Sequence, residues 1–548
     1  MKYSLLKMTH SCVIGGFLVV VTCNSWGAIV ENLTVGNAKA LSLGNAVTAD
    51  PPGIDSIHFN PAGLARLDGR QGNLKLLVAG LNFKIDFGGH DARTQQVLDE
   101  YGYEDEAAYS TSETSTVGLK IPFSEGVKEW PLPVLIAPLG GASYRPPGSS
   151  VTYATSVYTP LAAGYIRDSD DPGRFMGEEL SLVKITYFSP SIGFELSDTW
   201  LVGASIGFSW QGAGVKLPLR VPSSVLVFAD SLVNLFQNQG VCPDPNDQSP
   251  FLDLCGGALG PYTNITELEI DAEDALVWNV NVGALWTPTP WFTWGIVYQA
   301  ESVGHLKGTY RMVYGDQWVN LFGNLYQSDA WNIINAVVPF PTGQRNSPDG
   351  EGIETGDVAV DIIMPAHFST GISVMVTPSW KLNFDVKWTD WAAWEGLEVK
   401  FDRQVDFLKL AKLLSPYAES QTLTIPRNYE STWNWALGLE YQYNSNLAIR
   451  MGYEPRKSSI PDDKQDVLLP IGDAELFGMG FAYRLGADQM VDVGLGYLLA
   501  KADVPAGSST NANSTDQAMN IIYNPYAGTD FSSQVQGFLF ELSYTSQF

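Results

Sequence analysis

The feature that most constrains this chain is a series of runs in which apolar and polar residues alternate, joined in turn by very short and very long connections. In the first run, Leu74, Leu76 and Val78 fall on one face of an extended chain, because successive side chains of a strand point to opposite sides. Similar runs recur to the C-terminus. Short turns that alternate with long loops are typical of an outer-membrane β-barrel, whereas a soluble β-sandwich spaces its strands more evenly.

We therefore predict an all-β fold, a transmembrane barrel of fourteen antiparallel strands. The expected strands lie near residues 73–87, 133–146, 151–164, 180–196, 200–217, 274–288, 292–312, 357–377, 380–400, 432–443, 447–456, 474–485, 490–502 and 535–548. No later stretch reaches the roughly 18 apolar residues of a transmembrane helix, so any membrane must be crossed by strands.

Aromatic residues give two local signals. Three short turns end in tryptophan, at Trp200, Trp291 and Trp380, and such rings at one end of successive hairpins are typical of an interfacial girdle. The last strand has an apolar face that includes Phe538, and the chain ends on Phe548. A terminal aromatic residue on such a strand resembles the assembly signal of outer-membrane proteins.

The first 27 residues have the features of a secretory signal peptide. Lys2 and Lys7 form a positive start, an apolar segment follows at 13–21, and small residues precede a cleavage site before Ala28. The chain of 548 residues carries a formal net charge of -27. Such acidity repels nucleic-acid phosphates, so we expect an exported protein without a nucleic-acid partner.

Residues 28–69 differ from the rest, because they are rich in glycine, alanine and small polar residues. They have too few large side chains to form a core, so they can be ordered only inside something larger. Asn60-Pro61-Ala62 would form a rigid turn, since Pro61 fixes φ and the Asn60 side chain can cap the turn. An ordinary linker with an Asn-Pro turn is the alternative.

Cys242 and Cys255 are the cysteines that remain once the leader is removed. They flank a turn-rich loop, and in an oxidising compartment we expect a disulfide that contributes about 3 kcal/mol. Two thiols without a nearby histidine are a poor ligand set, so we expect no metal there.

Several long loops are rich in apolar residues. Two of them carry the candidate ligand-binding side chains Phe228, Leu232, Phe236, Trp318 and Phe322. A third loop should form an amphipathic helix at 406–414. These surfaces either pack on one another as a cap or form an outward groove for a hydrophobic ligand. A pore for sugars or ions would have polar loops and rings of charge instead.

Together these features resemble the FadL family of outer-membrane transporters for long-chain fatty acids and other hydrophobic compounds. The resemblance covers essentially the whole mature chain and is most specific at Gly36–Asp50 and at Asn60-Pro61-Ala62. Weaker matches occur in order at Leu306-Lys307-Gly308, Met364-Pro365-Ala366 and Ser459-Ile460-Pro461-Asp462. The resemblance implies a signal peptide at 1–27, a small N-terminal hatch at 28–69 inside the lumen, and a barrel at 70–548.

The family also implies a route for the ligand. It would adsorb between outer loops at about 220–272 and 313–356, then reach a deeper site closed by the N-terminus from Ala28 onwards. Movement of the hatch, with Asn60, Pro61 and Ala62, would open a passage, and a kink in the third strand would release ligand sideways into the membrane. The basic candidates for the fatty-acid carboxylate are Lys216, Arg220, Lys307 and Arg311, unless they are ordinary rim charges.

The ligand itself stays open, because family members that take up aromatic hydrocarbons or alkanes share the scaffold, and export of oxidised fatty acids is a further alternative. The histidines of the mature chain form no recognisable triad or metal spacing, so we expect no enzyme, cofactor or metal. We expect a monomer in the outer membrane of a Gram-negative bacterium, in contact with outer-membrane lipid, or with detergent once extracted.

Overall fold

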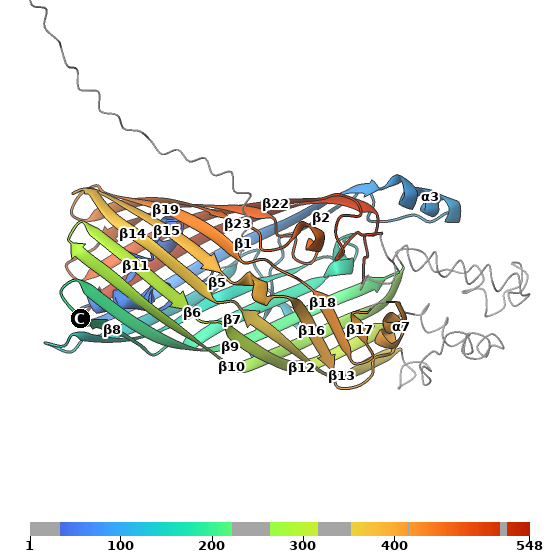
Figure 1. Cartoon of the computed structure of the whole chain (residues 1–548), viewed down its shortest axis with the longest axis horizontal. Coiled ribbons are helices and arrows are strands. Elements are labelled where there is room, and N and C mark those ends of the chain that lie inside the picture. Colours follow the sequence, from blue (N-terminus) through green and yellow to red (C-terminus); the bar gives the residue numbers. More distant parts are fainter. Residues whose placement is uncertain (1–32, 222–262, 316–351, 415, 516–522) are drawn as a thin grey trace, which may run out of the picture.

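The computed structural model describes residues 33–221, 263–315, 352–414, 416–515 and 523–548. Within these ranges the chain forms a closed antiparallel barrel that crosses its wall 14 times, as the sequence predicts. We call each crossing, whether one strand or two strands in line, a stave. Figure 1 shows the short turns at one end and α3 and α7 at the other, where the long connections lie. No helix in these ranges is long and apolar enough to cross a membrane.

Nine staves are continuous strands, and five consist of two strands in line. The continuous staves are β1 (Arg70–His90), β5 (Leu135–Tyr144), β6 (Val151–Ile166), β9 (Trp200–Arg220), β10 (Asn264–Thr289), β20 (Leu447–Arg456), β21 (Asp473–Arg484), β22 (Gln489–Val504) and β23 (Thr529–Gln547). The divided staves are β7 (Glu179–Phe188) with β8 (Ser191–Glu195), β11 (Phe292–Gln299) with β12 (Ser302–Tyr314), β13 (Ile353–Met364) with β14 (His367–Thr377), β15 (Trp380–Thr389) with β16 (Gly396–Phe401), and β18 (Thr422–Pro426) with β19 (Thr432–Gln442). Pairing of β1 with β23 closes the barrel.

The breaks within staves are the main departure from the predicted strands. Two of them fall at Ser189-Pro190 and at Pro365-Ala366. Proline has no amide hydrogen for a neighbouring strand, so it interrupts the ladder of hydrogen bonds without ending the stave. The sixth stave also begins at Asn264 rather than at 274, because its charged outer half still pairs with β9 and β12.

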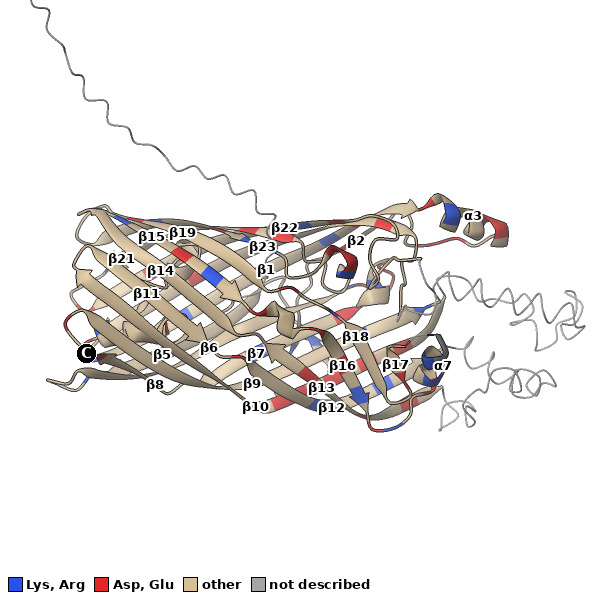
Figure 2. Ribbon diagram, in the orientation of Figure 1, with Lys and Arg blue, Asp and Glu red and all other residues tan. Residues whose placement is uncertain are grey.

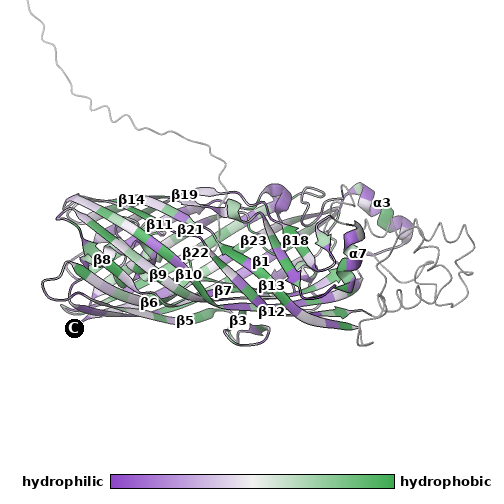
Figure 3. Cartoon of the chain, turned by 60° about the horizontal axis from the view of Figure 1, so that its bottom comes forward, coloured by the Kyte–Doolittle hydropathy of each residue, from purple (hydrophilic) through white to green (hydrophobic). Residues whose placement is uncertain are grey.

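Smaller elements decorate the loop end. They are α3 (Ala92–Tyr101), β2 (Thr111–Thr114), η3 (Arg174–Met176), η4 (Trp391–Ala393), α7 (Asp406–Leu414), β17 (Ala418–Glu419) and η5 (Asp462–Lys464). The helix α7 confirms the amphipathic helix predicted at 406–414. A hairpin of β3 (Gly118–Lys120) and β4 (Val127–Glu129) was not predicted, and Figure 3 shows it standing off the barrel wall.

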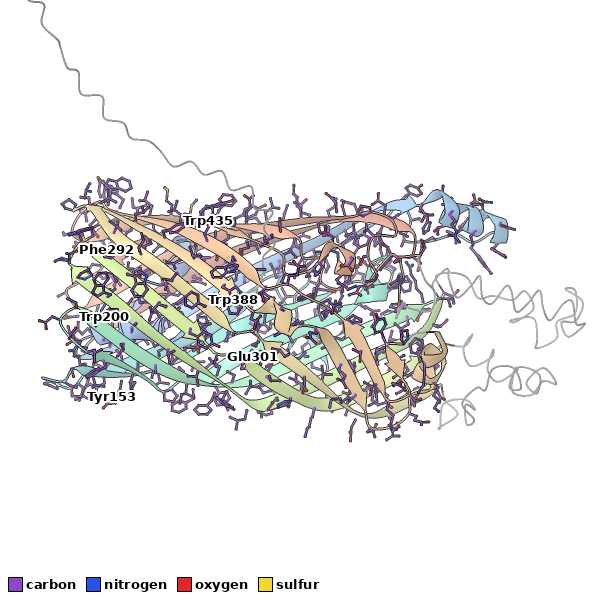
Figure 4. The ribbon with its side chains drawn as sticks, in the orientation of Figure 1. Tyr153, Trp200, Phe292, Glu301, Trp388 and Trp435 are labelled. Atoms are coloured by element: carbon purple, nitrogen blue, oxygen red, sulfur yellow. The ribbon has the colours of Figure 1, made fainter. Side chains whose placement is uncertain are left out.

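The outer wall carries an apolar belt toward the short-turn end. Its exposed side chains include Tyr153, Ile192, Trp278, Phe384, Trp435, Phe477 and Phe538. At the turns, Trp200, Trp291 and Trp380 are 37%, 56% and 40% exposed, which confirms the predicted girdle. Figure 4 shows Trp200 at this end of the barrel. Charged residues are denser toward the loop end of the staves, as Figure 2 shows, so the wall there extends beyond the apolar belt.

Residues 33–69 lie inside the barrel and are almost entirely buried. They form four short helical pieces, α1 (Ala38–Ser42), η1 (Gly53–Asp55), α2 (Ser56–Phe59) and η2 (Pro61–Arg66). We call this segment the hatch. Its apolar side chains pack mainly on one another, in a cluster that includes Val35, Leu43, Ile57 and Leu64. The predicted leader at 1–27 lies outside the described residues.

Candidate functional site

The hatch is seated on glycines of the barrel wall. A side chain at Gly203 would overlap the backbone of Pro61, and one at Gly452 or Gly478 would overlap the backbone of α1 and the residues just after it. Further inward glycines touch the hatch on β10, β11 and β22. Because these positions lack a Cβ atom, the hatch backbone approaches the strands directly. The seat is therefore a fit of backbone on backbone around much of the barrel.

Asp55 fixes the hatch to one side of the wall. Its carboxylate is 2.7 Å from Lys75 Nζ on β1, and both side chains are almost fully buried. The same carboxylate accepts a hydrogen bond from Asn37 Nδ2 at 2.7 Å, within the hatch, and one from Asn73 Nδ2 at 3.4 Å, on the wall. Removing either partner of a buried ion pair is strongly destabilising, because the charge left behind has no water around it.

Asp50 fixes the opposite side. Its carboxylate lies 2.9 Å from Lys39 Nζ and 3.1 Å from Lys381 Nζ, and Lys381 also contacts Glu440. Burial alone would raise the pKa of Asp50, but the two ammonium groups hold this pKa well below its ordinary value. The carboxylate is therefore ionised throughout the neutral range and pairs the hatch with β15.

Asn60-Pro61-Ala62 forms the turn that the sequence predicts. Asn60 is extended, with φ of −166°, Pro61 begins η2, and Asn60 Oδ1 accepts a hydrogen bond from the Ala62 amide at 3.2 Å. Asn60 Nδ2 donates to the carbonyl oxygen of Thr48 at 2.8 Å and reaches carbonyl oxygens of β10 and β11. The motif thus holds two parts of the hatch together and ties them to the wall.

Above the hatch the lumen is lined by two apolar clusters. One contains Leu306, Tyr310 and Val360 from β12 and β13, and the other contains Phe83, Leu476, Leu498 and Val535 from β1 and β21–β23. Leu33, the first described residue, packs in the second cluster. The first described residue of the hatch therefore packs on an apolar surface that continues toward the loops.

Lys184 is a lumen-facing cation on β7. It shares a strand face with Leu180 and Leu182, whose side chains pack against the two apolar clusters. The Lys184 side chain is buried, its Nζ donates to Ser302 Oγ at 2.6 Å, and it makes no ion pair within the described ranges. Beside it, neither amide atom of Gln211 has a hydrogen-bond partner among the described residues. The two side chains offer polar groups to a molecule lying along the apolar lining.

Beside the hatch, the pairing between β5 and β6 is incomplete and leaves a gap in the barrel wall. We call this gap the wall parting. These strands pair only from Gly140–Tyr144 to Tyr153–Val157, and the register of β6 on β7 then shifts between Tyr158 and Leu161. Thr34 Oγ1 of the hatch donates to the Thr159 carbonyl at this shift, at 2.9 Å. A small recess lies at the parting, lined by Ala79, Leu81, Phe83, Thr116, Val117, Leu119, Leu135, Ala162, Ala163, Gly164 and Tyr165.

The basic residues selected from the sequence lie elsewhere. Lys216 contacts Glu178 at 2.8 Å and Arg311 contacts Glu269 at 3.5 Å. On the outer half of β12, Lys307 and Arg311 alternate with residues of the lumen cluster and so face outward. Arg220 lies at the loop end, where its Nε donates to the Pro525 carbonyl at 2.7 Å and its guanidinium stacks on Phe175 and Tyr526. The structure brings none of these four residues beside the hatch, and their role toward a ligand stays a prediction.

Several predicted residues lie outside the described residues. These are the loop side chains Phe228, Leu232, Phe236, Trp318 and Phe322, the hatch residue Ala28, and the cysteines Cys242 and Cys255. The outer groove and the disulfide therefore stay predictions.

Sequence reasoning missed Lys184 and Thr34. The signal for Lys184 was a lysine on the same strand face as Leu180 and Leu182, but period-two alternation does not say which face of the strand is the lumen. Thr34 had no signal, because its partner is a carbonyl oxygen exposed by a register shift far along the chain.

The chain matches, over residues 18–548, the family described as outer membrane protein transport protein (OMPP1/FadL/TodX). It is 22% identical over 306 residues to a long-chain fatty acid transport protein of Escherichia coli O6:H1, which covers 56% of each chain. It is 23% identical over 210 residues to a long-chain fatty acid transport protein of Salmonella typhi, which covers 38% of this chain and 42% of that one. The matches thus span about half the length of these curated relatives.

Solved structures show the same fold. A Pseudomonas aeruginosa FadL homologue superimposes with a TM-score of 0.64 at 17% identity, over 96% of this chain and 100% of that one. The Ralstonia pickettii toluene transporter TbuX superimposes with a TM-score of 0.57 at 16% identity, over 94% and 99% of the two chains. At these identities the likeness extends to the fold alone.

Proposed function

The chain belongs to the OMPP1/FadL/TodX family of Gram-negative outer-membrane transport proteins, and on that premise we propose that it is a passive transporter of long-chain fatty acids. Outer loops capture the ligand, the hatch gates its passage, and it leaves sideways through the wall. Capture by the loops rests on the sequence alone.

The observation that carries the choice of a fatty acid is Lys184. An ammonium group that has no carboxylate partner in the described ranges, set beside apolar clusters, suits a ligand with one acidic head and a long chain. The hydroxyl of Ser302 and the amide of Gln211 would share the head group. Related structures include a toluene transporter, so aromatic hydrocarbons are the second candidate, and they would not need the charge. Alkanes and export of oxidised fatty acids are further alternatives on this scaffold.

The hatch is suited to gating because it contacts the wall through hydrogen bonds, ion pairs and close backbone approaches at glycines. A ligand bound at Lys184 lies one strand away from the register shift where Thr34 is held. Loss of the Thr34 hydrogen bond and of the Leu33 contact would release these two hatch residues from the wall beside the parting. A shift between two such arrangements costs a few kcal/mol, which is within the differential affinity that a ligand can supply.

The sideways exit needs no further energy source. A fatty chain gains about 0.8 kcal/mol per CH₂ when it stays out of water. The small apolar recess between β5 and β6 is lined by residues of the lumen face and of the outer face of the wall, which supports an exit there. The ligand gradient then drives the flow.

The test is the double variant Asn60→Ala with Pro61→Ala. We expect the barrel to assemble and remain heat-resistant, because no stave is altered, while uptake of a labelled long-chain fatty acid slows greatly. The slowing results from loss of the hydrogen bonds that order the hatch between Thr48 and the wall. Uptake equal to that of the unaltered protein at the same surface abundance would mean that the hatch is only a plug.

A further inference from the structure

The hairpin β3–β4 covers the wall parting from outside. Val117 and Leu119 pack with Ala162, Val183 and Trp210 in one buried cluster. By alternation along β6 and β7, Ala162 and Val183 face outward, because Tyr165 and Leu180 on the opposite face belong to the lumen cluster. The recess is therefore bounded by lumen-facing residues of β1 on one side and by the hairpin on the other.

Polar contacts hold the hairpin against the outer wall. Lys120 Nζ lies 2.7 Å from Asp271 on β10, with the Lys120 side chain buried, and the Phe123 amide donates to Glu273 at 3.1 Å. The Lys120 amide donates to Ser181 Oγ at 2.7 Å. Because only a few such bonds hold the short hairpin, it can detach from the wall without disturbing the staves.

The tip of the hairpin exposes two large apolar side chains. Phe123 is 82% exposed and Ile121 is also exposed, and the exposed Glu125 follows them in the tip. Phe123 has φ of 61°, a left-handed conformation that is strained for an aromatic residue. Leu276 is 60% exposed and lies three residues after Glu273, at the edge of the apolar belt that faces the loop end. The tip thus sets exposed apolar side chains at the loop-side edge of the apolar belt.

We propose that this hairpin is a lipid-seated cover on the wall opening, and that a hydrophobic molecule leaving the lumen passes under it into the outer leaflet. The inference rests on the proposed sideways exit. With the cover closed, Val117 and Leu119 fill the outer side of the recess. When the contact between Lys120 and Asp271 breaks, the hairpin lifts, and its apolar underside guides the ligand to acyl chains instead of water.

The first test measures access under the hairpin in the full-length protein in lipid nanodiscs. Ala162→Cys places a thiol beneath the cover, and its alkylation is read by peptide mass at that residue. We expect Asp271→Asn to speed the alkylation about fivefold to tenfold, since one partly exposed ion pair is lost. Glu269→Gln is the matched control, because Glu269 lies on the same face of β10 but contacts Arg311. Thr309→Cys, on the exposed outer face of β12, reports the reagent's intrinsic rate.

The second test measures lipid contact. A fluorophore on Phe123→Cys should be quenched by brominated acyl chains in vesicles, whereas the same fluorophore on Tyr109→Cys, which is 75% exposed near the loop end, should not be quenched. Equal quenching at both positions would overturn the seating in lipid. An unchanged alkylation rate in Asp271→Asn would overturn the cover.

Uptake separates this inference from the proposed function. If the cover limits exit, Asp271→Asn takes up labelled fatty acid faster than the unaltered protein. Faster alkylation with unchanged uptake would overturn control of exit by the hairpin. An absence of uptake in the unaltered protein would instead overturn the proposed function, and the alkylation and quenching results would still decide whether the hairpin covers the opening and sits in lipid.

Discussion

The hatch and the apolar lining above it share one barrel but are held by different forces. The hatch meets the wall through glycine contacts and through ion pairs such as Asp55 with Lys75. The lining consists of side chains such as Leu476 and Leu498, whose attraction has no preferred direction. Directional contacts are made or lost as a set, so the hatch suits a gate, whereas non-directional contacts let a ligand slide, so the lining suits a path.

The strongest way to break this comparison is to place one methyl group in the hatch seat. In Gly203→Ala the new Cβ would overlap the backbone of Pro61, which cannot move aside as a flexible side chain can. We expect docking of the hatch to weaken by about 3 kcal/mol, which lowers the ratio of docked to undocked hatch roughly a hundredfold. Ion conductance in planar bilayers should therefore rise. Gly486→Ala is the control, because no atom lies within 4 Å of a Cβ there. Equal conductance in both variants would show that the seat tolerates the added atom.

A change in the lining sharpens the comparison on the side of the ligand. Lys184→Gln keeps a polar side chain but removes the charge beside Ser302. Loss of one charge-assisted hydrogen bond, about 1.5–3 kcal/mol, should weaken binding of a long-chain fatty acid by on the order of tenfold to a hundredfold. Binding of toluene should be unchanged, as should closed-state conductance. Equal affinity of both proteins for the acid would favour a neutral ligand as the substrate.

Asp50→Asn gives the smallest expected effect. The variant leaves Lys39 and Lys381 close together without their shared carboxylate. Because these side chains are only partly buried, we expect the docked hatch to lose about 1–2 kcal/mol at pH 7, between the values for exposed and for buried ion pairs. Because the pKa of Asp50 is lowered in the docked hatch, its stabilisation is fully present above the ordinary pKa of about 4 and is lost as pH falls through the lowered value. Conductance of the variant should therefore exceed that of the unaltered protein at pH 7, and the difference should persist down to about pH 4. A difference that vanished between pH 7 and pH 5 would contradict this assignment.

Much of the site could be predicted only as a region. The small residues at 28–69 indicate a segment that needs a host, and Asn60-Pro61-Ala62 indicates its rigid turn. The partners of that segment could not be predicted, because Lys75, Lys381 and Gly203 are ordinary strand residues until the barrel closes around the hatch. The hairpin over β6 was missed for a similar reason, since its strands are only three residues long and lie inside a predicted loop.

The sequence by itself determined the barrel, its 14 staves, the aromatic girdle and the closing last strand, because period-two alternation and connection length are local properties of the chain. Tertiary structure decided which charges face the lumen. Lys184 and Lys307 both interrupt apolar runs, yet one points inward and the other outward. Alternation defines two faces of each strand, and only closure of the sheet, with its register shift in β6, decides which of them encloses the hatch and the path above it.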